Sequence, residues 1–181
     1  MYLKEYIFTT DYILYNLKRK RHFIKSIIIY ATKHGCAAKA AEKIAKNLNG
    51  QTLIVNISKQ PVPPLKSYDT IILGGSVYIG QLNKKLSGFL NENQSALLGK
   101  NIGLFTCAAR EGEEGQKQLE TVFSEVLYKH AKSIANFGYE LDIKKMGFFE
   151  KLIVKKIMGV QDSMYKLSDE VINDFVAKII A

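Results

Sequence analysis

Thr32, Gly35 and the residues around them form a short turn, TKHGCA, that could bind a phosphate group. The turn lies between four apolar residues (27–30) and a stretch with helical spacing that ends at Leu48. The Thr32 hydroxyl can donate a hydrogen bond, glycine permits a tight turn, and the amides at the start of a helix stabilise an anion. No GKS, GKT or GxGxxG follows, so the turn is neither a P-loop nor a dinucleotide fingerprint. It predicts a monophosphate site, with an ordinary βα turn as the alternative.

The two cysteines of the chain, Cys36 and Cys107, lie far apart in the sequence and have no CxxC spacing. This spacing favours neither a disulfide framework nor a zinc site, and it fits a reducing cytoplasm. A thiol at a helix N-terminus can have a lowered pKa and sense oxidants, but we favour a small filler in a tight turn for Cys36 and the same role for Cys107. No Ser/His/Asp arrangement or HExxH motif supports a hydrolase, and we expect no metal.

Strands and helices alternate along the chain and would position these residues. Buried strands are expected at 27–30, 52–57, 69–73, 102–106 and 133–137. Helices are expected at 82–98 and 116–130, and a last helix is capped by Ser168 and ends near Ile180. This α/β alternation predicts a parallel sheet with right-handed crossovers and helices on both faces.

Three unusual loops follow the first, third and fourth expected strands. They contain TKHGCA, GGSVYIG with three glycines (74–80), and TCAAREG (106–112). Open α/β sheets bind ligands at the carboxyl ends of their strands, where the strand order reverses. Tyr78, which lies between glycines, favours stacking on a planar ligand over an ordinary surface aromatic. His34 could neutralise a phosphate or be a solvent-exposed loop histidine.

With these three loops, the chain from Lys25 to Ala181 resembles the flavodoxin-like FMN-binding domains. The resemblance implies a three-layer sandwich whose five-stranded parallel sheet has the order 2-1-3-4-5, with FMN as the cofactor in one crevice. The implied phosphate-binding residues are Thr32, Lys33, His34, Gly35, Cys36 and Ala37. The implied ring-flanking residues are Ser76, Val77, Tyr78, Ile79 and Gly80, with Thr106, Cys107 and Ala108 near the pyrimidine end. Ala37 stands where the family often has Ser or Thr, so one hydroxyl donor is missing.

Within that superfamily the chain is similar to the flavin-dependent, menaquinone-linked protoporphyrinogen dehydrogenases. The likeness rests on GxSxxxG at 74–80 and on the basic, aromatic segment GYELDIKKMGFFEKLIVKKIMG at 138–159. It implies an FMN-dependent oxidoreductase that passes electrons from a reduced organic substrate, such as protoporphyrinogen, to a quinone or similar acceptor. The alternative is a flavodoxin-type electron carrier without its own substrate. Such carriers tend to be acidic and this chain is basic, so we rank the carrier second.

The formal net charge of +9 is concentrated in two segments, 1–25 and 144–156, each of which carries a net charge of +4. Such clusters indicate an anionic partner, such as a membrane surface or a carboxylate-bearing substrate, or simply a solvated basic face. We expect no nucleic-acid partner, because no recognised binding module carries these charges. Helical spacing places Phe149, Leu152, Ile153 and Ile157 on one face and Lys151 and Lys155 on another. That face would suit anionic lipid, with packing on the sheet as the alternative.

The 181 residues suit one domain, which we expect at 25–181 with a basic inserted segment at about 139–160. Residues 1–24 form an N-terminal extension, either an amphipathic helix or a flexible lead-in. Its apolar residues precede its basic run, the reverse of a secretory signal. No apolar run approaches the roughly 18 residues of a membrane span. We therefore expect a cytoplasmic protein, with peripheral contact at the inner face of the membrane as a further expectation.

Overall fold

The computed structural model describes residues 25–48, 50–142, 147–148, 151–152, 156 and 163–181. The N-terminal extension expected at 1–24 lies outside these residues, and so do Phe149, Ile153, Lys155 and Ile157 of the expected basic helix.

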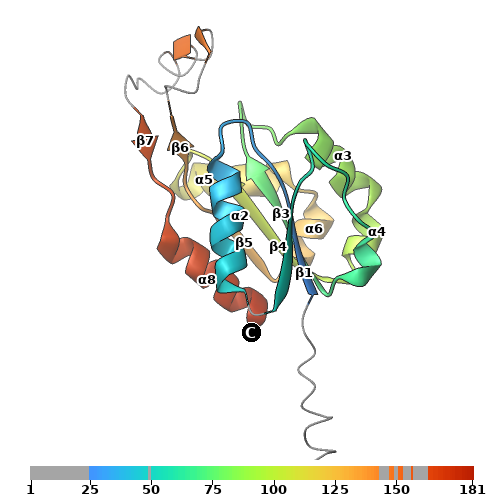
Figure 1. Ribbon diagram of the computed structural model, residues 1–181. Helices are drawn as coiled ribbons and strands as arrows, with labels where there is room; N and C mark the ends of the chain where they lie inside the picture. Colours follow the sequence, from blue (N-terminus) through green and yellow to red (C-terminus); the bar gives the residue numbers. More distant parts are fainter. Residues whose placement is uncertain (1–24, 49, 143–146, 149–150, 153–155, 157–162) are drawn as a thin grey trace, which may run out of the picture.

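A five-stranded parallel sheet forms the centre of the domain (Figure 1). Its strands are β1 (Lys25–Ala31), β2 (Gln51–Asn56), β3 (Thr70–Ser76), β4 (Asn101–Cys107) and β5 (Ser133–Asn136). The order is β2-β1-β3-β4-β5, and every neighbouring pair is parallel. The expected order 2-1-3-4-5 is therefore confirmed, and the carboxyl ends of β1, β3 and β4 meet at one edge.

Helices cover both faces of the sheet and complete the expected three layers (Figure 1). One face is covered by α2 (Cys36–Asn47) and α8 (Asp169–Ile180). The other is covered by α3 (Lys84–Glu92), α4 (Gln94–Leu97), α5 (Gly112–Val122) and α6 (Glu125–His130), while the short helix η1 (Leu65–Ser67) precedes β3. Side chains alternate along each strand, so Ile27 and Ile29 face α3–α6 whereas Ile28 faces α2 and α8.

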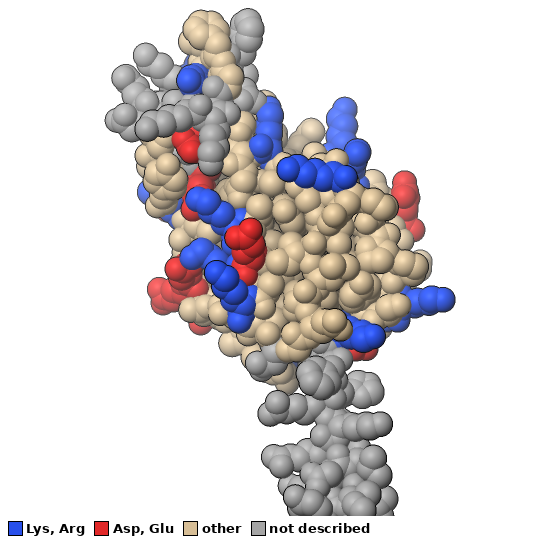
Figure 2. Space-filling view, viewed as in Figure 1, with Lys and Arg blue, Asp and Glu red and all other residues tan. Residues whose placement is uncertain are grey.

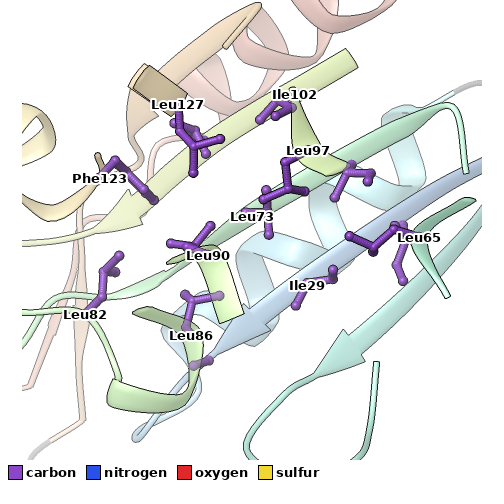
Figure 3. Packing of buried hydrophobic residues seen from close by; sticks show 14 of the residues in the cluster. Ile29, Leu65, Leu73, Leu82, Leu86, Leu90, Leu97, Ile102, Phe123 and Leu127 are labelled. Carbon is purple, nitrogen blue, oxygen red and sulfur yellow. The ribbon is translucent and has the colours of Figure 1, made fainter. Parts of the chain in front are cut away.

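The two halves of the core differ in their side chains. Leucines from α3, α4 and α6 fill the α3–α6 side, among them Leu86, Leu97 and Leu127 (Figure 3). On the other side, the alanines of α2 let that helix lie close to the sheet, and three phenylalanines pack beside them. The Phe105 and Phe137 rings stack at 5.1 Å, and the Phe175 ring meets Phe137 edge-on.

The two middle helices that the sequence predicts are each divided in two. The side-chain amide of Asn93 donates to the Phe89 carbonyl at the end of α3, and α4 begins at the next residue. Phe123 is extended, and the Ser124 hydroxyl then caps α6 by accepting from the Leu127 amide at 3.4 Å. Short polar side chains at these breaks provide alternative hydrogen bonds for the backbone. The predicted Ser168 cap of α8 is confirmed, since its hydroxyl accepts from the Val171 amide at 3.3 Å.

Gly74 and Gly75 belong to β3 and not, as the sequence suggested, to the loop after it. Both lie where the backbone is crowded. A Cβ on Gly74 would lie 2.2 Å from the Phe105 carbonyl oxygen, and one on Gly75 would lie 2.6 Å from the Ala31 carbonyl oxygen. These glycines therefore permit close packing within the sheet, and the loop itself begins at Val77.

A small antiparallel ribbon flanks the segment where the sequence predicts a basic insertion. Its strands are β6 (Glu140–Leu141) and β7 (Met164–Tyr165), which Figure 1 shows beside the start of α2. The chain enters at Gly138, where φ is +83° and a Cβ would lie 2.0 Å from the Lys166 carbonyl oxygen. The Lys166 amide donates to the Tyr139 carbonyl, and the Ser168 amide donates to the Phe137 carbonyl. Entry and exit of the insertion thus lie side by side.

Candidate functional site

The loop after β1 leads directly into the N-terminus of α2. The Thr32 hydroxyl accepts a hydrogen bond from the Gly35 amide at 3.0 Å, and Gly35 has a φ of +100° that favours glycine. Among the residues that the structure describes, no side chain caps α2, and its first turn contains no acidic residue. The positive end of the helix dipole is therefore not neutralised by the helix itself, which suits an anion.

The loop after β3 is a tight two-residue turn. Tyr78 and Gln81 exchange backbone hydrogen bonds of 3.0 and 3.1 Å, and Ile79 and Gly80 between them have φ values of +50° and +74°. Two left-handed residues in succession define a type I′ turn, which normally uses Asn-Gly. Ile79 is β-branched and 70% exposed, so the turn holds a strained residue at its tip.

The loop after β4 is held by Asn136, the last residue of β5. The Asn136 Oδ1 accepts from the Ala108 amide at 3.0 Å and from the Thr106 hydroxyl at 3.3 Å. Its Nδ2 donates to the carbonyls of Ala108 and Arg110 at 3.1 and 2.9 Å. Sequence reasoning missed Asn136, although a polar residue at the end of a buried strand was the available signal.

Direct contacts join the three loops to one another. The Thr32 and Ser76 hydroxyls lie 3.5 Å apart, and the Lys33 ammonium lies 5.1 Å from the centre of the Tyr78 ring. The Val77 amide donates to the Cys107 carbonyl at 3.1 Å. These contacts come from elements far apart in the sequence, so the loops after β1, β3 and β4 form one continuous rim.

The residues expected at the site differ in their solvent exposure, and therefore in whether a ligand can contact their side chains. Lys33, Tyr78, Ile79 and Gly80 are exposed, whereas Thr32, His34, Gly35, Ser76 and Val77 are partly buried. Cys36, Ala37, Thr106, Cys107 and Ala108 are buried. Val77 packs on the core, and the Thr106 hydroxyl donates to Asn136. Lys33, Tyr78 and Ile79 of the first two loops are thus accessible to a ligand, whereas the side chains of residues 106–108 are buried in the fold.

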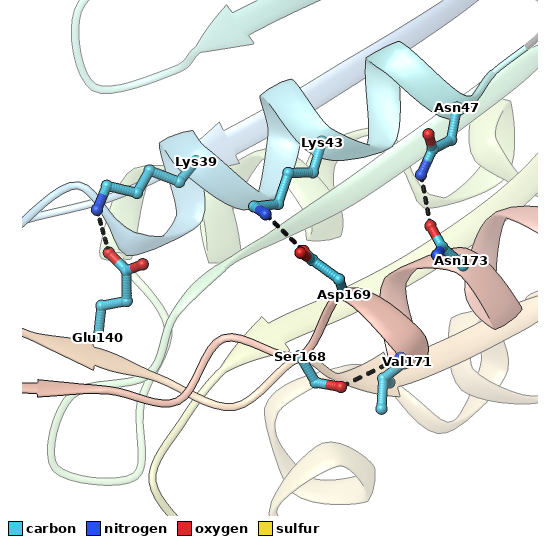
Figure 4. Close-up of polar contacts among 8 residues, drawn as sticks. All are labelled: Lys39, Lys43, Asn47, Glu140, Ser168, Asp169, Val171 and Asn173. Atoms are coloured by element: carbon cyan, nitrogen blue, oxygen red, sulfur yellow. Dashed lines mark hydrogen bonds and ion pairs between the residues drawn. The ribbon is translucent and has the colours of Figure 1, made fainter.

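Polar contacts attach the ribbon and α8 to α2 (Figure 4). The Lys39 ammonium contacts the Glu140 carboxylate at 2.6 Å, and this bond raises the pKa of Lys39. Further along α2, Lys43 pairs with Asp169 and Asn47 bonds to Asn173. On the other side, the Lys166 ammonium lies 3.9 Å from the Glu111 carboxylate in the loop after β4. The ribbon and the residue that follows it therefore contact the first turn of α2 and the loop after β4.

Lysine and arginine side chains stand along the upper edge of the face in Figure 2, above the ends of β1 and β3. The loops after β1 and β4, the first turns of α2 and α3 and the residue after β7 contain the basic residues Lys33, Arg110, Lys39, Lys84, Lys85 and Lys166. Such an edge attracts anionic ligands and partners. Within the described ranges, no group of three or more His, Cys, Asp or Glu side chains could hold a metal ion.

Comparison with known proteins identifies the family. Residues 27–166 match the flavodoxin domain, and the chain belongs to that family. A short-chain flavodoxin associated with a bacterial microcompartment is similar in structure, with a TM-score of 0.59 and 19% identity over 87% of this chain and 97% of its own. Oxidised flavodoxin 2 and flavodoxin 1 from Bacillus cereus have TM-scores of 0.56 and 0.54, with 18% and 19% identity over 86% of this chain and 97% of theirs. No curated protein matches the sequence.

The flavodoxin family implies FMN as the cofactor, and the residues present fit it. FMN has one phosphate, and the loop after β1 offers one open helix N-terminus with a hydroxyl beside it. When bound, FMN supplies electron-transfer chemistry that side chains cannot provide, and the fold therefore indicates a redox function.

Proposed function

We propose that the protein is an FMN-dependent oxidoreductase that passes electrons from a reduced organic substrate to a quinone or similar acceptor, with protoporphyrinogen as the candidate substrate. The observation that carries this proposal is the attachment beside the site of the β6–β7 ribbon, whose strands flank the basic segment in the sequence. Lys39–Glu140 joins the ribbon to the first turn of α2, and Lys166–Glu111 joins it to the loop after β4. An electron carrier needs no such segment next to its cofactor.

In this proposal each loop has a separate task. The Thr32 hydroxyl and the amides of 36 and 37 bind the phosphate, while the Gly35 amide holds the Thr32 oxygen in place, and the missing hydroxyl at Ala37 leaves most of this work to the backbone. Tyr78 and the backbone of 76–80 lie along the flavin ring. Residues 106–108 contribute backbone groups at the pyrimidine end, because their side chains are buried.

The insertion would bind the anionic partner. Of its described residues, Phe148 is 72% and Leu152 50% exposed, and Lys151 and Lys156 are also exposed. Apolar and cationic side chains together suit the propionates and ring of a porphyrinogen, or an anionic membrane surface. Among the described residues no helix is long and apolar enough to cross a bilayer, so the proposed membrane contact is peripheral.

The second candidate is an electron carrier, which the turn after β3 favours. Ile79 and Tyr78 are 70% and 38% exposed at its tip. An exposed apolar tip beside the flavin loops would let a protein partner approach the cofactor closely.

Anaerobic turnover of FMN-loaded protein, with protoporphyrinogen as donor and a menaquinone analogue as acceptor, separates the two candidates. Lys151, Lys155 and Lys156 are replaced with Glu in one variant. The matched control replaces Lys66, Lys100 and Lys132 with Glu as well. These lysines lie near the amino-terminal ends of β3, β4 and β5, at the edge of the sheet opposite the site.

We expect both variants to retain FMN and only the insertion variant to lose turnover, by about tenfold if each lost charge contact contributes about 0.5 kcal/mol. Equal turnover in the two variants would assign the insertion to packing. Absence of substrate turnover in the unaltered protein, with electron exchange between protein partners, would favour the carrier. Recovery of FAD alone would contradict the monophosphate site.

A further inference from the structure

A cavity of about 320 Å³ lies beside the turn after β3, between the start of α3 and the end of α5. Residues 80–82, Lys84 and Ser87 line one side of it, and Thr121 and Val122 line the other. None of these lining residues belongs to the loops after β1 and β4. The volume is at the lower end of the range for ligand pockets, about 300–1,000 Å³, and therefore suits a small molecule.

Two of the lining side chains are apolar and continuous with the core. Leu82 is 7% exposed and belongs to the core on the α3–α6 side, and Figure 3 shows it on the same side of the sheet as Leu86 and Leu90. Val122, the last residue of α5, packs against the same core. A ligand that covers Leu82 and Val122 removes apolar surface from water, so the cavity favours a ligand with an apolar body.

Three of the lining side chains supply polar groups. In the described part of the chain, no hydrogen bond or ion pair involves the side chains of Gln81, Lys84 or Ser87. Lys84 is exposed, and the first turn of α3 contains no acidic residue. The neighbouring Lys85 instead donates to the Ser58 carbonyl at 3.5 Å. An ammonium, a hydroxyl and an amide can together donate to both oxygens of a carboxylate, so the polar part of the cavity favours an acid.

We propose that this cavity is a binding site for a small monocarboxylate with an apolar body. The Lys84 ammonium and the Ser87 hydroxyl donate hydrogen bonds to the carboxylate, and the apolar body covers Leu82 and Val122. One ammonium balances the charge of a carboxylate, whereas a phosphate dianion leaves negative charge without compensation. The proposal goes beyond the redox function, because it requires neither FMN nor electron transfer.

The first test titrates phenylpropionate into the full-length protein without FMN and follows the backbone amides by NMR. We expect saturable shifts concentrated at Gly80, Gln81, Ser87 and Val122, with a millimolar dissociation constant because the probe is small. Phenylpropanamide has nearly the same shape without the charge, and it should bind about tenfold more weakly. Equal binding of the acid and the amide, shifts at other residues, or shifts that do not saturate would overturn the proposal.

Two neighbouring lysines provide a matched pair of variants. Lys84→Gln should weaken phenylpropionate binding by about tenfold and leave phenylpropanamide binding unchanged, because only the charge contact is lost. Lys85→Gln is the control, since Lys85 lies in the same helical turn but does not line the cavity. It should bind both probes as the unaltered protein does. An equal loss in the two variants would show that the acid responds only to the general positive charge of this surface, which would contradict a built site.

The last arm adds saturating FMN to the unaltered protein. Probe binding should persist, because the lining residues come from neither the loop after β1 nor the loop after β4. Displacement of phenylpropionate by FMN would assign the cavity to the cofactor site and overturn the proposal of a separate one. Failure of FMN to bind is seen in its absorbance, and it does not affect the probe titrations, which are performed without flavin.

Discussion

The loops after β3 and β4 lie at the same edge of the sheet but keep their shapes in different ways. The loop after β4 is held from outside, because the Asn136 side chain makes three hydrogen bonds to it and a fourth to Thr106 near the end of β4. The loop after β3 is closed by its own backbone at Tyr78 and Gln81 and has a strained, exposed isoleucine at its tip. One wall of the site is therefore rigid, whereas the other keeps a conformation that a bound ligand can stabilise.

Gly115 adds to the rigidity of the loop after β4. A Cβ at this position in α5 would lie 2.6 Å from the Arg110 carbonyl oxygen. The helix therefore packs directly against the loop backbone. The loop after β3 and the end of its strand make one short hydrogen bond to a neighbour, Val77–Cys107 at 3.1 Å, and two longer contacts, Thr32–Ser76 at 3.5 Å and Lys33–Tyr78 at 5.1 Å. Strain at a ligand-binding turn is a common functional device, and here the two kinds of loop lie next to each other.

The largest expected effect comes from Asn136→Ala. It leaves the Thr106 hydroxyl and the Ala108 amide without their partner in a partly buried site, so we expect the free energy of unfolding to fall by about 3 kcal/mol. Urea denaturation measures this change. Asn101→Ala, an exposed asparagine at the other end of β4, is the control and should change stability by less than about 0.5 kcal/mol. An equal loss of stability in the two variants would show that the loop after β4 does not depend on the Asn136 hydrogen bonds.

Ile79→Gly should act in the opposite direction and by less. Removing the side chain relieves a φ of +50°, which costs a β-branched residue about 1–2 kcal/mol, and glycine returns part of this as entropy of the unfolded chain. We expect the protein without FMN to gain about 0.5–1 kcal/mol of stability. Val126→Gly, a similarly exposed residue in α6, should lose about 0.5–1 kcal/mol. If Ile79→Gly lowered the stability, the φ of +50° at Ile79 would not be a source of strain.

Lys33→Gln should have the smallest effect. It removes an exposed cation–π contact with Tyr78 and one positive charge from the loop after β1, where we expect the phosphate. We expect FMN affinity to fall by about two- to fivefold, corresponding to about 0.5–1 kcal/mol, with the difference shrinking in high salt. Fluorescence titration of FMN measures it, with Lys66→Gln at the opposite edge of the sheet as the control. Equal affinities for the two variants would leave Lys33 with no part in phosphate binding.

The sequence predicted the strands well because buried parallel strands appear as short apolar runs, such as 27–30 and 69–73. It placed Gly74 and Gly75 in a loop because glycine usually weakens a strand. The close approach of the Phe105 backbone, which requires these glycines, depends on a partner distant in the sequence. The breaks at Asn93 and Ser124 were missed for a different reason, since apolar spacing continues through both.

The edge that carries the site was predictable from the three loops and the strand order that the family resemblance implied. The roles of the individual residues there stay predictions. The contacts that shape the edge were not predictable, because Asn136, Glu140 and Glu111 act across long sequence separations on partners in other elements.

The two chain segments that lead into and out of the predicted insertion are fixed to each other. Gly138 lies against the Lys166 backbone, and the amides of Lys166 and Ser168 donate to the carbonyls of Tyr139 and Phe137. The five-stranded sheet is complete without the residues between Leu141 and Met164. Segments of other lengths and compositions can therefore be exchanged between Leu141 and Met164 at a modest entropic cost, about 0.6 kcal/mol for each doubling of length. Such a graft point would let one domain carry different segments while the loops after β1, β3 and β4 stay the same.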